Sequence, residues 1–347
     1  MESKTLVVAS YCNEGIPSAE NFRIETTTVD VANLTDGEFI AKLLILSADP
    51  YMRNMVRQAG FTNRTIAIGN PLTGFVTAEV VESKSDKFPK GMFFGASLPF
   101  QTVQRLSDGA MLKTVSWNLS SYVTRETVSH GIGVLGMPGA TVYGGLLKVL
   151  RPKEGETIFI SGAAGAVGGL VGQLAKNICG CKVLGSCGGA DKVKFVTETL
   201  GFDAAIDYKS GDGSTATLQA ALAAVAPKGI DMYFDNVGGA HFEASFRSLR
   251  PAGRIAICGG IGEYNKAEYS GVNINPLQMI YTQQRIEGFL STEYLIAQEF
   301  LPKMKQWMDE KKIVAVPETT FAGIESWPTA FQALFTGANT GKVVVTV

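Results

Sequence analysis

The sequence is poor in the side chains that hold catalytic metal ions. It contains only two histidines, His130 and His241, and its five cysteines show neither a C-x-x-C pair nor a disulfide-framework spacing. Because a zinc site needs three or four converging ligands, we expect no metal centre. We interpret the cysteines as reduced thiols of a cytoplasmic protein and the two histidines as structural or exposed.

Neither a basic stripe nor a long apolar run is present. The chain has 31 lysines and arginines against 32 aspartates and glutamates, for a formal net charge of -1. We therefore expect no nucleic-acid partner and no attraction to anionic membrane surfaces. No uninterrupted apolar run is long enough to span a bilayer, and the charged start of the chain does not resemble a secretory signal.

The length and the texture of the chain predict two domains. Its 347 residues, 46% apolar and 18% charged, exceed what one hydrophobic core usually serves. Residues 1–128 are rich in Val, Thr, Ile and Phe and are broken at short intervals by turn residues, which is typical of an all-β domain. In residues 129–312 strands and helices alternate, which predicts a doubly wound parallel sheet of the α/β class. We expect residues 313–347 to rejoin the first β domain, which would then be discontinuous.

A glycine-rich turn near the middle of the chain predicts a dinucleotide site. Residues 161–169 follow an apolar strand and precede a predicted helix. Gly165 and Gly168 match the second and third glycines of the fingerprint G-x-G-x-x-G, and Ala163 stands at the first. The unpaired N–H groups of the helix start would face a pyrophosphate. An ordinary turn is the alternative, but the strand before it and the helix after it favour a dinucleotide.

The end of the next predicted strand, 182–186, favours NADPH over NADH. An NAD-binding unit places an Asp or Glu there to bind the ribose hydroxyl, whereas this chain has Cys187 followed by two glycines. Without that carboxylate a 2′-phosphate is not repelled. Lys192 in the next helix and Tyr208 at the end of the third strand can approach it. A solvated lysine and a tyrosine packed at a strand end are the structural alternatives.

Six short motifs follow one another along the chain. They are 49–53 (Asp-Pro-Tyr-Met-Arg), 136–139 (Gly-Met-Pro-Gly), 235–239 (Asp-Asn-Val-Gly-Gly), 258–261 (Cys-Gly-Gly-Ile), 287–289 (Glu-Gly-Phe) and 337–342 (Gly-Ala-Asn-Thr-Gly-Lys). Together they resemble the zinc-independent prostaglandin reductase and alkenal double-bond reductase group of the medium-chain dehydrogenase/reductase superfamily, over essentially the whole chain. The resemblance implies a GroES-like β-barrel substrate domain, a Rossmann domain that binds NADPH, and a homodimer.

The resemblance also implies cofactor contacts. Lys192 and Tyr208 match the residues that hold the 2′-phosphate, Asn339 matches one that reaches the cofactor, and the backbone of Phe289 and Leu290 matches the strand end at the nicotinamide. The predicted cofactor-binding residues are Ala163, Ala164, Gly165, Val167, Gly168, Cys187, Lys192, Tyr208, Asn236, Cys258, Tyr264, Phe289, Leu290 and Asn339. Residues 188–192 lack the serine and paired acids common before this lysine, which leaves the helix register open.

Without a metal, the reaction that fits is hydride transfer from NADPH to the β-carbon of an alkene conjugated to a carbonyl. Tyr264 matches a loop tyrosine implicated in substrate binding or enolate stabilisation, and we expect its hydroxyl to donate to the enolate oxygen. Tyr51 is expected to shape the pocket. A packed loop aromatic and a turn anchor are the structural alternatives for these two tyrosines. Hydrophobic enals, enones and keto-prostaglandin-like molecules are the expected substrates.

Two other functions remain open. Quinone reduction shares the cofactor and the lack of zinc. A non-catalytic NADPH-binding protein is the second, since the superfamily has lens-crystallin-like members, although Tyr264 and Lys192 argue for an enzyme. The zinc-dependent half of the superfamily binds its metal through cysteine, histidine and a Gly-His-Glu strand motif. This chain lacks that motif, so alcohol dehydrogenation by a Lewis acid is not the leading mechanism.

Overall fold

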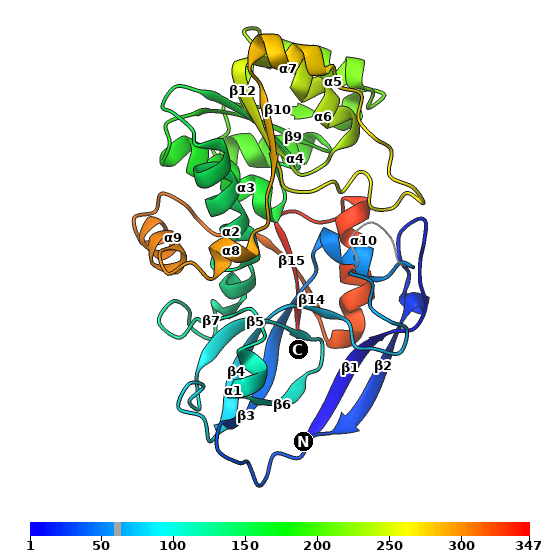
Figure 1. Ribbon diagram of the computed structural model, residues 1–347, viewed down its shortest axis with the longest axis vertical. Helices are drawn as coiled ribbons and strands as arrows, with labels where there is room; N and C mark the ends of the chain where they lie inside the picture. The colour runs from blue at the N-terminus through cyan, green and yellow to red at the C-terminus, as the bar shows by residue number, and fades with distance from the viewer. Residues whose placement is uncertain (59–63) are drawn as a thin grey trace. The chain divides into compact units, whose positions relative to one another are not determined.

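The chain has a mixed α/β fold, as the sequence predicts, and it divides into two compact units. The computed structural model describes residues 1–58 and 64–347. The first unit comprises Met1–Met137, Asn265–Ala267 and Glu318–Val347, and the second comprises Pro138–Tyr264 and Glu268–Pro317. Figure 1 shows the elements of both units in chain order.

The first unit is built on a seven-stranded sheet of order β14-β15-β3-β4-β5-β7, in which β6 also pairs with β3, and on a separate β1-β2 pair. All neighbours are antiparallel except β14 and β15. The strands are β1 (Glu2–Val8), β2 (Phe22–Thr28), β3 (Glu38–Ser47), β4 (Thr73–Ser83), β5 (Phe93–Pro99), β6 (Val103–Ser107), β7 (Ser116–Asn118), β14 (Glu318–Ala322) and β15 (Lys342–Thr346). The helical segments are η1 (Ala19–Asn21), η2 (Pro50–Met55), α1 (Asp108–Met111), η3 (Val128–Ile132), η7 (Ile324–Ser326) and α10 (Trp327–Thr336).

The composition of residues 313–347 predicts strands, and helix α10 corrects that prediction for residues 327–336. The helix buries Trp327 and Phe331, whose rings stack with centroids 4.8 Å apart. It ends at Gly337, which has a φ of 75° and forms a left-handed C-cap. The buried residues of α10 recur at helical spacing. The valine-rich strand that follows the helix favoured a strand prediction for the whole segment.

The second unit holds a six-stranded sheet of order β10-β9-β8-β11-β12-β13, and all its strand pairs are parallel. The strands are β8 (Thr157–Ser161), β9 (Lys182–Cys187), β10 (Ala204–Asp207), β11 (Ile230–Asp235), β12 (Leu249–Ile257) and β13 (Arg285–Gly288). If these six strands are numbered 1 to 6 along the chain, they lie in the doubly wound order 3-2-1-4-5-6. Its strand order reverses between β8 and β11, and ligands of such sheets bind at that point, beyond the carboxyl ends of the strands.

Helices connect the strands of this sheet. They are α2 (Met137–Val142), η4 (Tyr143–Leu150), α3 (Ala166–Asn177), α4 (Ala190–Lys194), η5 (Phe195–Thr199), η6 (Tyr208–Ser210), α5 (Thr215–Val225), α6 (Gly239–Arg247), α7 (Pro276–Thr282), α8 (Thr292–Leu295) and α9 (Phe300–Asp309). Leu222 of α5 and Phe242 of α6 belong to one core cluster with sheet residues such as Phe159. These two helices therefore cover one face of the sheet, while α7, which the sequence analysis did not predict, contacts β12.

The apolar stripe of Ile296, Phe300, Met304 and Trp307 predicts a helix over residues 293–312, which Pro302 should kink or restart. The structure has two helices there. Helix α8 ends at Leu295 and α9 begins at Phe300. Pro302 lies in the first turn of α9, where a missing N–H removes no helical hydrogen bond. Phe300, Met304 and Trp307 are buried as predicted, but Ile296 is 62% exposed because it lies in the break.

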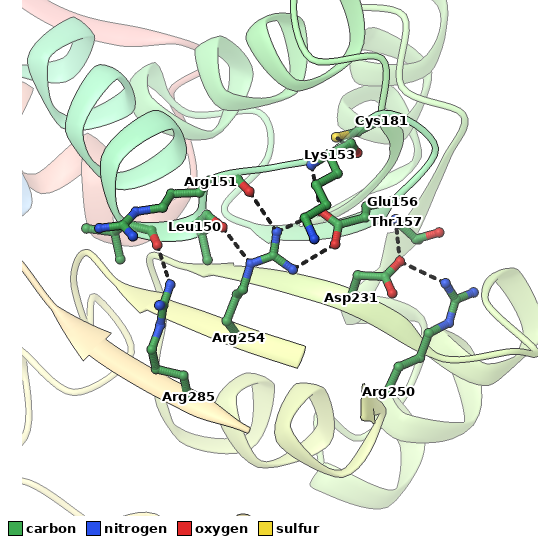
Figure 2. A network of polar contacts seen from close by, with 11 residues as sticks. Leu150, Arg151, Lys153, Glu156, Thr157, Cys181, Asp231, Arg250, Arg254 and Arg285 are labelled. Carbon is green, nitrogen blue, oxygen red and sulfur yellow. Dashed lines mark hydrogen bonds and ion pairs between the residues drawn. The ribbon is translucent and has the colours of Figure 1, made fainter. Parts of the chain in front are cut away.

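Arginines and carboxylates form a network of polar contacts near the amino ends of β8 and β11 (Figure 2). The glycine-rich turn follows the carboxyl end of β8. Arg254 makes two hydrogen bonds to the carboxylate of Glu156, at 2.9 and 2.6 Å, and a third to the carbonyl of Leu150. Arg285 donates to the carbonyl of Val149 at 2.6 Å. These side chains satisfy carbonyls that the end of η4 leaves unpaired, so we interpret the network as structural. Within the described residues, no helix is long and apolar enough to cross a membrane.

Candidate functional site

The turn after β8 has the tight geometry that its glycines predict. Gly162 has a φ of 62°, and the backbone N–H of Gly165, which caps α3, donates to the Gly162 carbonyl at 3.0 Å. A Cβ on Gly168 would lie 2.3 Å from that carbonyl oxygen and 2.8 Å from the Cα of Ala163. Only glycine fits there, because any side chain would collide with the backbone of the turn. No side chain caps the start of α3, which leaves its first N–H groups for a ligand.

The remaining fingerprint residues line the same turn. Ala163 and Ala164 are buried, and the N–H of Ala163 donates to the carbonyl of Ser186 on β9 at 3.0 Å. Val167 is half-buried in the first turn of α3. The turn is therefore held against two neighbouring strands at the point where the strand order reverses. Its small side chains and uncapped amides fit a dinucleotide pyrophosphate.

A buried carboxylate that the sequence analysis did not single out joins this turn to β11. Asp235 accepts hydrogen bonds from the Tyr233 hydroxyl at 2.7 Å and from the backbone of Gly238 at 2.8 Å. Burial raises its pKa, although these hydrogen bonds oppose the shift. Asn236 donates from its side-chain amide to the Ser161 carbonyl at 2.7 Å. Asn236, a predicted cofactor residue, thus holds the end of β8 against β11. The sequence feature that could have identified Asp235 is its position at the start of the motif 235–239.

Cys187, Lys192 and Tyr208 lie near one another at the carboxyl end of β9 and β10. Burial raises the pKa of Cys187 to about 11, and the nearby Lys192 opposes that shift. Burial and the positive charge of Lys209 lower the pKa of Lys192. A Cβ on Gly188 would lie 2.9 Å from the Tyr208 hydroxyl oxygen, so the missing side chain makes room for that hydroxyl. The arrangement fits a phosphate bound between a lysine and a tyrosine.

A second carboxylate, Asp207, fixes the backbone near Lys192 and Tyr208. It does not stand where an NAD-binding unit places its acidic residue. Asp207 ends β10, the third strand of the sheet, rather than β9. Its Oδ1 accepts hydrogen bonds from the backbone of Gly189 at 2.8 Å and of Lys209 at 2.9 Å. Asp207 is not among the residues that the sequence predicts for the site. Its adjacency to Tyr208 was the only signal.

Tyr264 and Cys258 stand beyond the end of β12. The backbone amides of Cys258 and Gly259 donate to the Asp235 carbonyl at 2.9 and 3.1 Å. The Tyr264 hydroxyl oxygen accepts a hydrogen bond from the backbone N–H of Gly260 at 3.1 Å. Burial raises the pKa of Tyr264 above its ordinary value of 10.0, so the phenol is protonated at neutral pH. Because its oxygen is the acceptor in this bond, its proton can be donated elsewhere.

Phe289 and Leu290 directly follow β13. The Phe289 ring packs edge-on against Phe234, with centroids 6.1 Å apart, and a Cβ on Gly145 would lie 2.4 Å from it. Leu290 is 60% exposed. The half-buried Phe289 ring therefore holds the strand end against Phe234 and leaves the next backbone position at the carboxyl edge of the sheet.

The two remaining predicted residues, Tyr51 and Asn339, belong to the first unit. Burial and the charge of Asp49 raise the pKa of Tyr51, which lies on η2. Asn339 follows α10 and donates to the Gly341 carbonyl at 3.4 Å. Their two motifs, 49–53 and 337–342, meet in a buried ion pair, since Lys342 Nζ lies 3.3 Å from Asp49 Oδ1.

The residues directly after Tyr264 belong to the first unit. Arg53 donates from Nε to the Asn265 side-chain oxygen at 3.2 Å, and Arg57 donates to the Ala267 carbonyl at 2.8 Å. The sequence placed this whole stretch in the Rossmann domain, and no pattern in it marks the excursion.

Metal ligands do not gather in the part of the chain that the structure describes. Among residues 1–58 and 64–347, no group of three or more His, Cys, Asp and Glu side chains could hold a metal ion. Burial lowers the pKa of both His130 and His241. All five cysteines are unpaired thiols.

Comparison with known proteins gives matches along both units. A family described as "Zinc-binding dehydrogenase" matches residues 166–310, and one described as "N-terminal domain of oxidoreductase" matches residues 4–115. Prostaglandin reductase 1 of Mus musculus is 39% identical over 96% of this chain and 95% of its own length. The 2-alkenal reductase (NADP(+)-dependent) of Nicotiana tabacum is 37% identical over 100% of this chain and 98% of its own.

A solved structure agrees with these relatives over the whole fold. The crystal structure of CurA from Vibrio vulnificus in complex with NADPH superimposes with a TM-score of 0.86. The two sequences are 34% identical, and the match covers 99% of each chain.

Proposed function

The chain belongs to the prostaglandin reductase group of the medium-chain dehydrogenase/reductase superfamily, and on that premise we propose that it reduces the carbon–carbon double bond of α,β-unsaturated aldehydes and ketones with NADPH. The observation that carries the proposal is the protonated Tyr264 hydroxyl, held beyond the end of β12 by the Gly260 amide. The turn at 161–169, which fits a dinucleotide, stands at the same edge of the same sheet.

NADPH, when bound, would supply a hydride for the β-carbon of the substrate, and the double-bond electrons would then move onto the conjugated carbonyl as an enolate. Tyr264 donates its hydroxyl proton in a hydrogen bond to the enolate oxygen, where negative charge develops. The Gly260 N–H already bonded to the phenol oxygen compensates the charge that this donation leaves there. A proton from water or from Tyr264 then reaches the α-carbon and completes the saturated product.

The cofactor residues divide into three groups in this proposal. The turn residues Ala163, Ala164, Gly165, Val167 and Gly168 receive the pyrophosphate, and Cys187, Lys192 and Tyr208 surround the 2′-phosphate. Asn236, Cys258, Phe289 and Leu290 hold the nicotinamide end at the carboxyl edges of β11, β12 and β13. The positions of these residues on that edge support the assignment.

The first unit is proposed to supply the substrate pocket. The sequence predicts residues 1–128 and 313–347 for this domain, and the unit in the structure comprises Met1–Met137, Asn265–Ala267 and Glu318–Val347. In the proposal Tyr51 shapes its pocket and Asn339 reaches the cofactor. Hydrophobic enals, enones and keto-prostaglandin-like molecules are the proposed substrates. The names of the mouse and tobacco relatives support both the aldehyde and the keto-lipid class.

Turnover across a substrate panel tests the function. Purified protein and NADPH are mixed with a medium-chain 2-alkenal, an aromatic enone or a quinone, and NADPH oxidation is followed by its absorbance. We expect the enal and the enone to be consumed, and mass spectrometry to show a product with two added hydrogens and an intact carbonyl. Faster turnover of the quinone would instead make the protein a quinone oxidoreductase. NADPH binding without turnover of any of the three would make it a non-catalytic binder.

A homodimer through the β13 edge completes the proposal. Strand β13 lies at one end of the six-stranded sheet, so one side of its backbone is open to pair with a second copy. Nearby in the chain, helix α7 exposes Leu277, Ile280 and Tyr281. Light scattering after size exclusion should give a dimer mass, and Ile280→Lys should shift it toward the monomer. Leu112→Lys, at an exposed site of the first unit, is the matched control and should leave the mass unchanged.

A further inference from the structure

His241 lies where β9, β10 and α6 meet, beside the corner that holds Lys192 and Tyr208. It is 7% exposed, and its Nε2 lies 2.9 Å from the hydroxyl oxygen of Ser186, which is fully buried on β9. Its ring also packs against Tyr208, with centroids 5.4 Å apart and ring planes at 80°. The imidazole is therefore fixed by one neighbour and supports the other.

Tyr208 needs such a support. It is 37% exposed and begins η6, a three-residue helical turn that directly follows β10. Its hydroxyl oxygen lies 2.9 Å from the place a Cβ would take at Gly188. The ring thus packs against the His241 imidazole, and its hydroxyl end lies over the backbone of Gly188, which carries no side chain. A hydroxyl whose position is set in advance binds a phosphate with less entropy to lose.

We propose that His241 is a positioning residue for Tyr208, and through it a determinant of the preference for NADPH over NADH. This inference rests on the proposed contact between Tyr208 and the 2′-phosphate. His241 acts by orientation and not by charge, because burial lowers its pKa to about 4 and keeps the ring neutral at physiological pH. A histidine that merely packed α6 onto the sheet would affect both nucleotides alike.

A double-mutant cycle with cofactor fragments separates these roles. Calorimetry on the purified full chain measures the Kd of 2′,5′-ADP, which carries the 2′-phosphate, and of 5′-AMP, which lacks it. We expect His241→Leu to weaken 2′,5′-ADP by about threefold to tenfold, a coupling typical of residues in contact, and to leave 5′-AMP unchanged. In a Tyr208→Phe background the same substitution should have no further effect. Phe242→Leu, a buried neighbour on α6, is the matched control and should not change the ratio of the two constants.

The outcomes distinguish the inference from the proposal beneath it. If Tyr208→Phe alone leaves 2′,5′-ADP binding unchanged, the phosphate assignment of Tyr208 is wrong. Suppose instead that Tyr208→Phe does weaken 2′,5′-ADP binding. His241 then does not position Tyr208 if His241→Leu leaves 2′,5′-ADP binding unchanged or weakens the binding of both fragments equally. The same conclusion follows if His241→Leu has its full effect in the Tyr208→Phe background. Should His241→Leu not fold, His241→Gln keeps a polar partner for Ser186 but offers no ring to Tyr208. It should then show the same selective loss.

Discussion

The hydroxyl oxygen of Tyr264 lies 3.1 Å from the backbone nitrogen of Gly260 and accepts its hydrogen bond. This contact fixes the phenol beyond the end of β12 and leaves its proton to be donated. Tyr264→Phe should therefore lower kcat for an enal by roughly a hundredfold, the loss seen when one donor to a developing oxyanion is removed. Tyr122→Phe, in a loop of the first unit, is the control and should retain full turnover. Undiminished turnover of Tyr264→Phe would exclude the donor role.

Lys192 should set the cofactor preference of the enzyme. Removing its charge with Lys192→Ala deletes one charge-assisted hydrogen bond to the 2′-phosphate, worth roughly 1.5 to 3 kcal/mol. We expect the ratio of kcat/KM for NADPH to that for NADH to fall at least about tenfold. Lys194→Ala on the same helix removes an exposed lysine that faces Glu198 and should not change the ratio. An unchanged ratio in Lys192→Ala would contradict the assignment.

Gly168 should tolerate no side chain. A methyl group there would stand 2.3 Å from the Gly162 carbonyl oxygen, so Gly168→Ala must push the start of α3 away from the turn. We expect a loss of about 1 to 3 kcal/mol in the free energy of unfolding and a weaker Kd for NADPH. Gly271→Ala, where no atom lies within 4 Å of the new methyl group, should change neither quantity. Urea unfolding and fluorescence titration measure the two.

Lys342 and Asp49 should depend on each other for stability. Lys342 Nζ lies 3.3 Å from Asp49 Oδ1 and also donates to the Ala48 carbonyl at 3.0 Å, and both side chains are buried. Lys342→Met leaves a buried carboxylate without its cation, which costs about 3 to 5 kcal/mol. The double variant Asp49→Asn, Lys342→Met should recover most of that loss in urea unfolding. A single variant as stable as the parent would show that the pair is not needed.

Acid should destabilise the second unit through His241. Its pKa in the folded protein is about 4 against an ordinary value of 6.5, so the unfolded chain binds its proton first as the pH falls. The contribution of the neutral His241 ring to the free energy of unfolding is complete above pH 6.5. It falls by up to about 3 kcal/mol between pH 6.5 and about pH 4.

Unfolding curves at several pH values measure how steeply the free energy of unfolding declines with falling pH. His130, whose pKa is also lowered, contributes in the same direction. The difference between the parent and His241→Gln therefore isolates the share of His241, and the variant should show the shallower decline. Equal slopes in the two proteins would contradict the shift.

Local pattern predicted the strands of both units well but failed where a segment's surroundings decide its structure. The runs at 157–161, 182–186 and 230–235 have apolar centres with polar residues only near their ends, which is typical of strands buried on both faces, and the structure has strands there. The stretch 293–312 has helical periodicity throughout, yet α8 and α9 are separated by a break that exposes Ile296. Periodicity records which residues can share a face. It does not record where one helix ends and the next begins.

The sequence by itself determined the fold class, the dinucleotide turn and the absence of an acid at the end of β9, because each depends on neighbours in the chain. Only the tertiary structure brought Tyr208 above Gly188, His241 against Tyr208, and Asp235 beneath the turn. These contacts join residues on different strands and helices, and the strand order decides which of them meet. A one-dimensional pattern carries no information about that order. The sequence therefore predicts which side chains form the site around Lys192 and Tyr208. Their relative positions follow only from the assembled sheet.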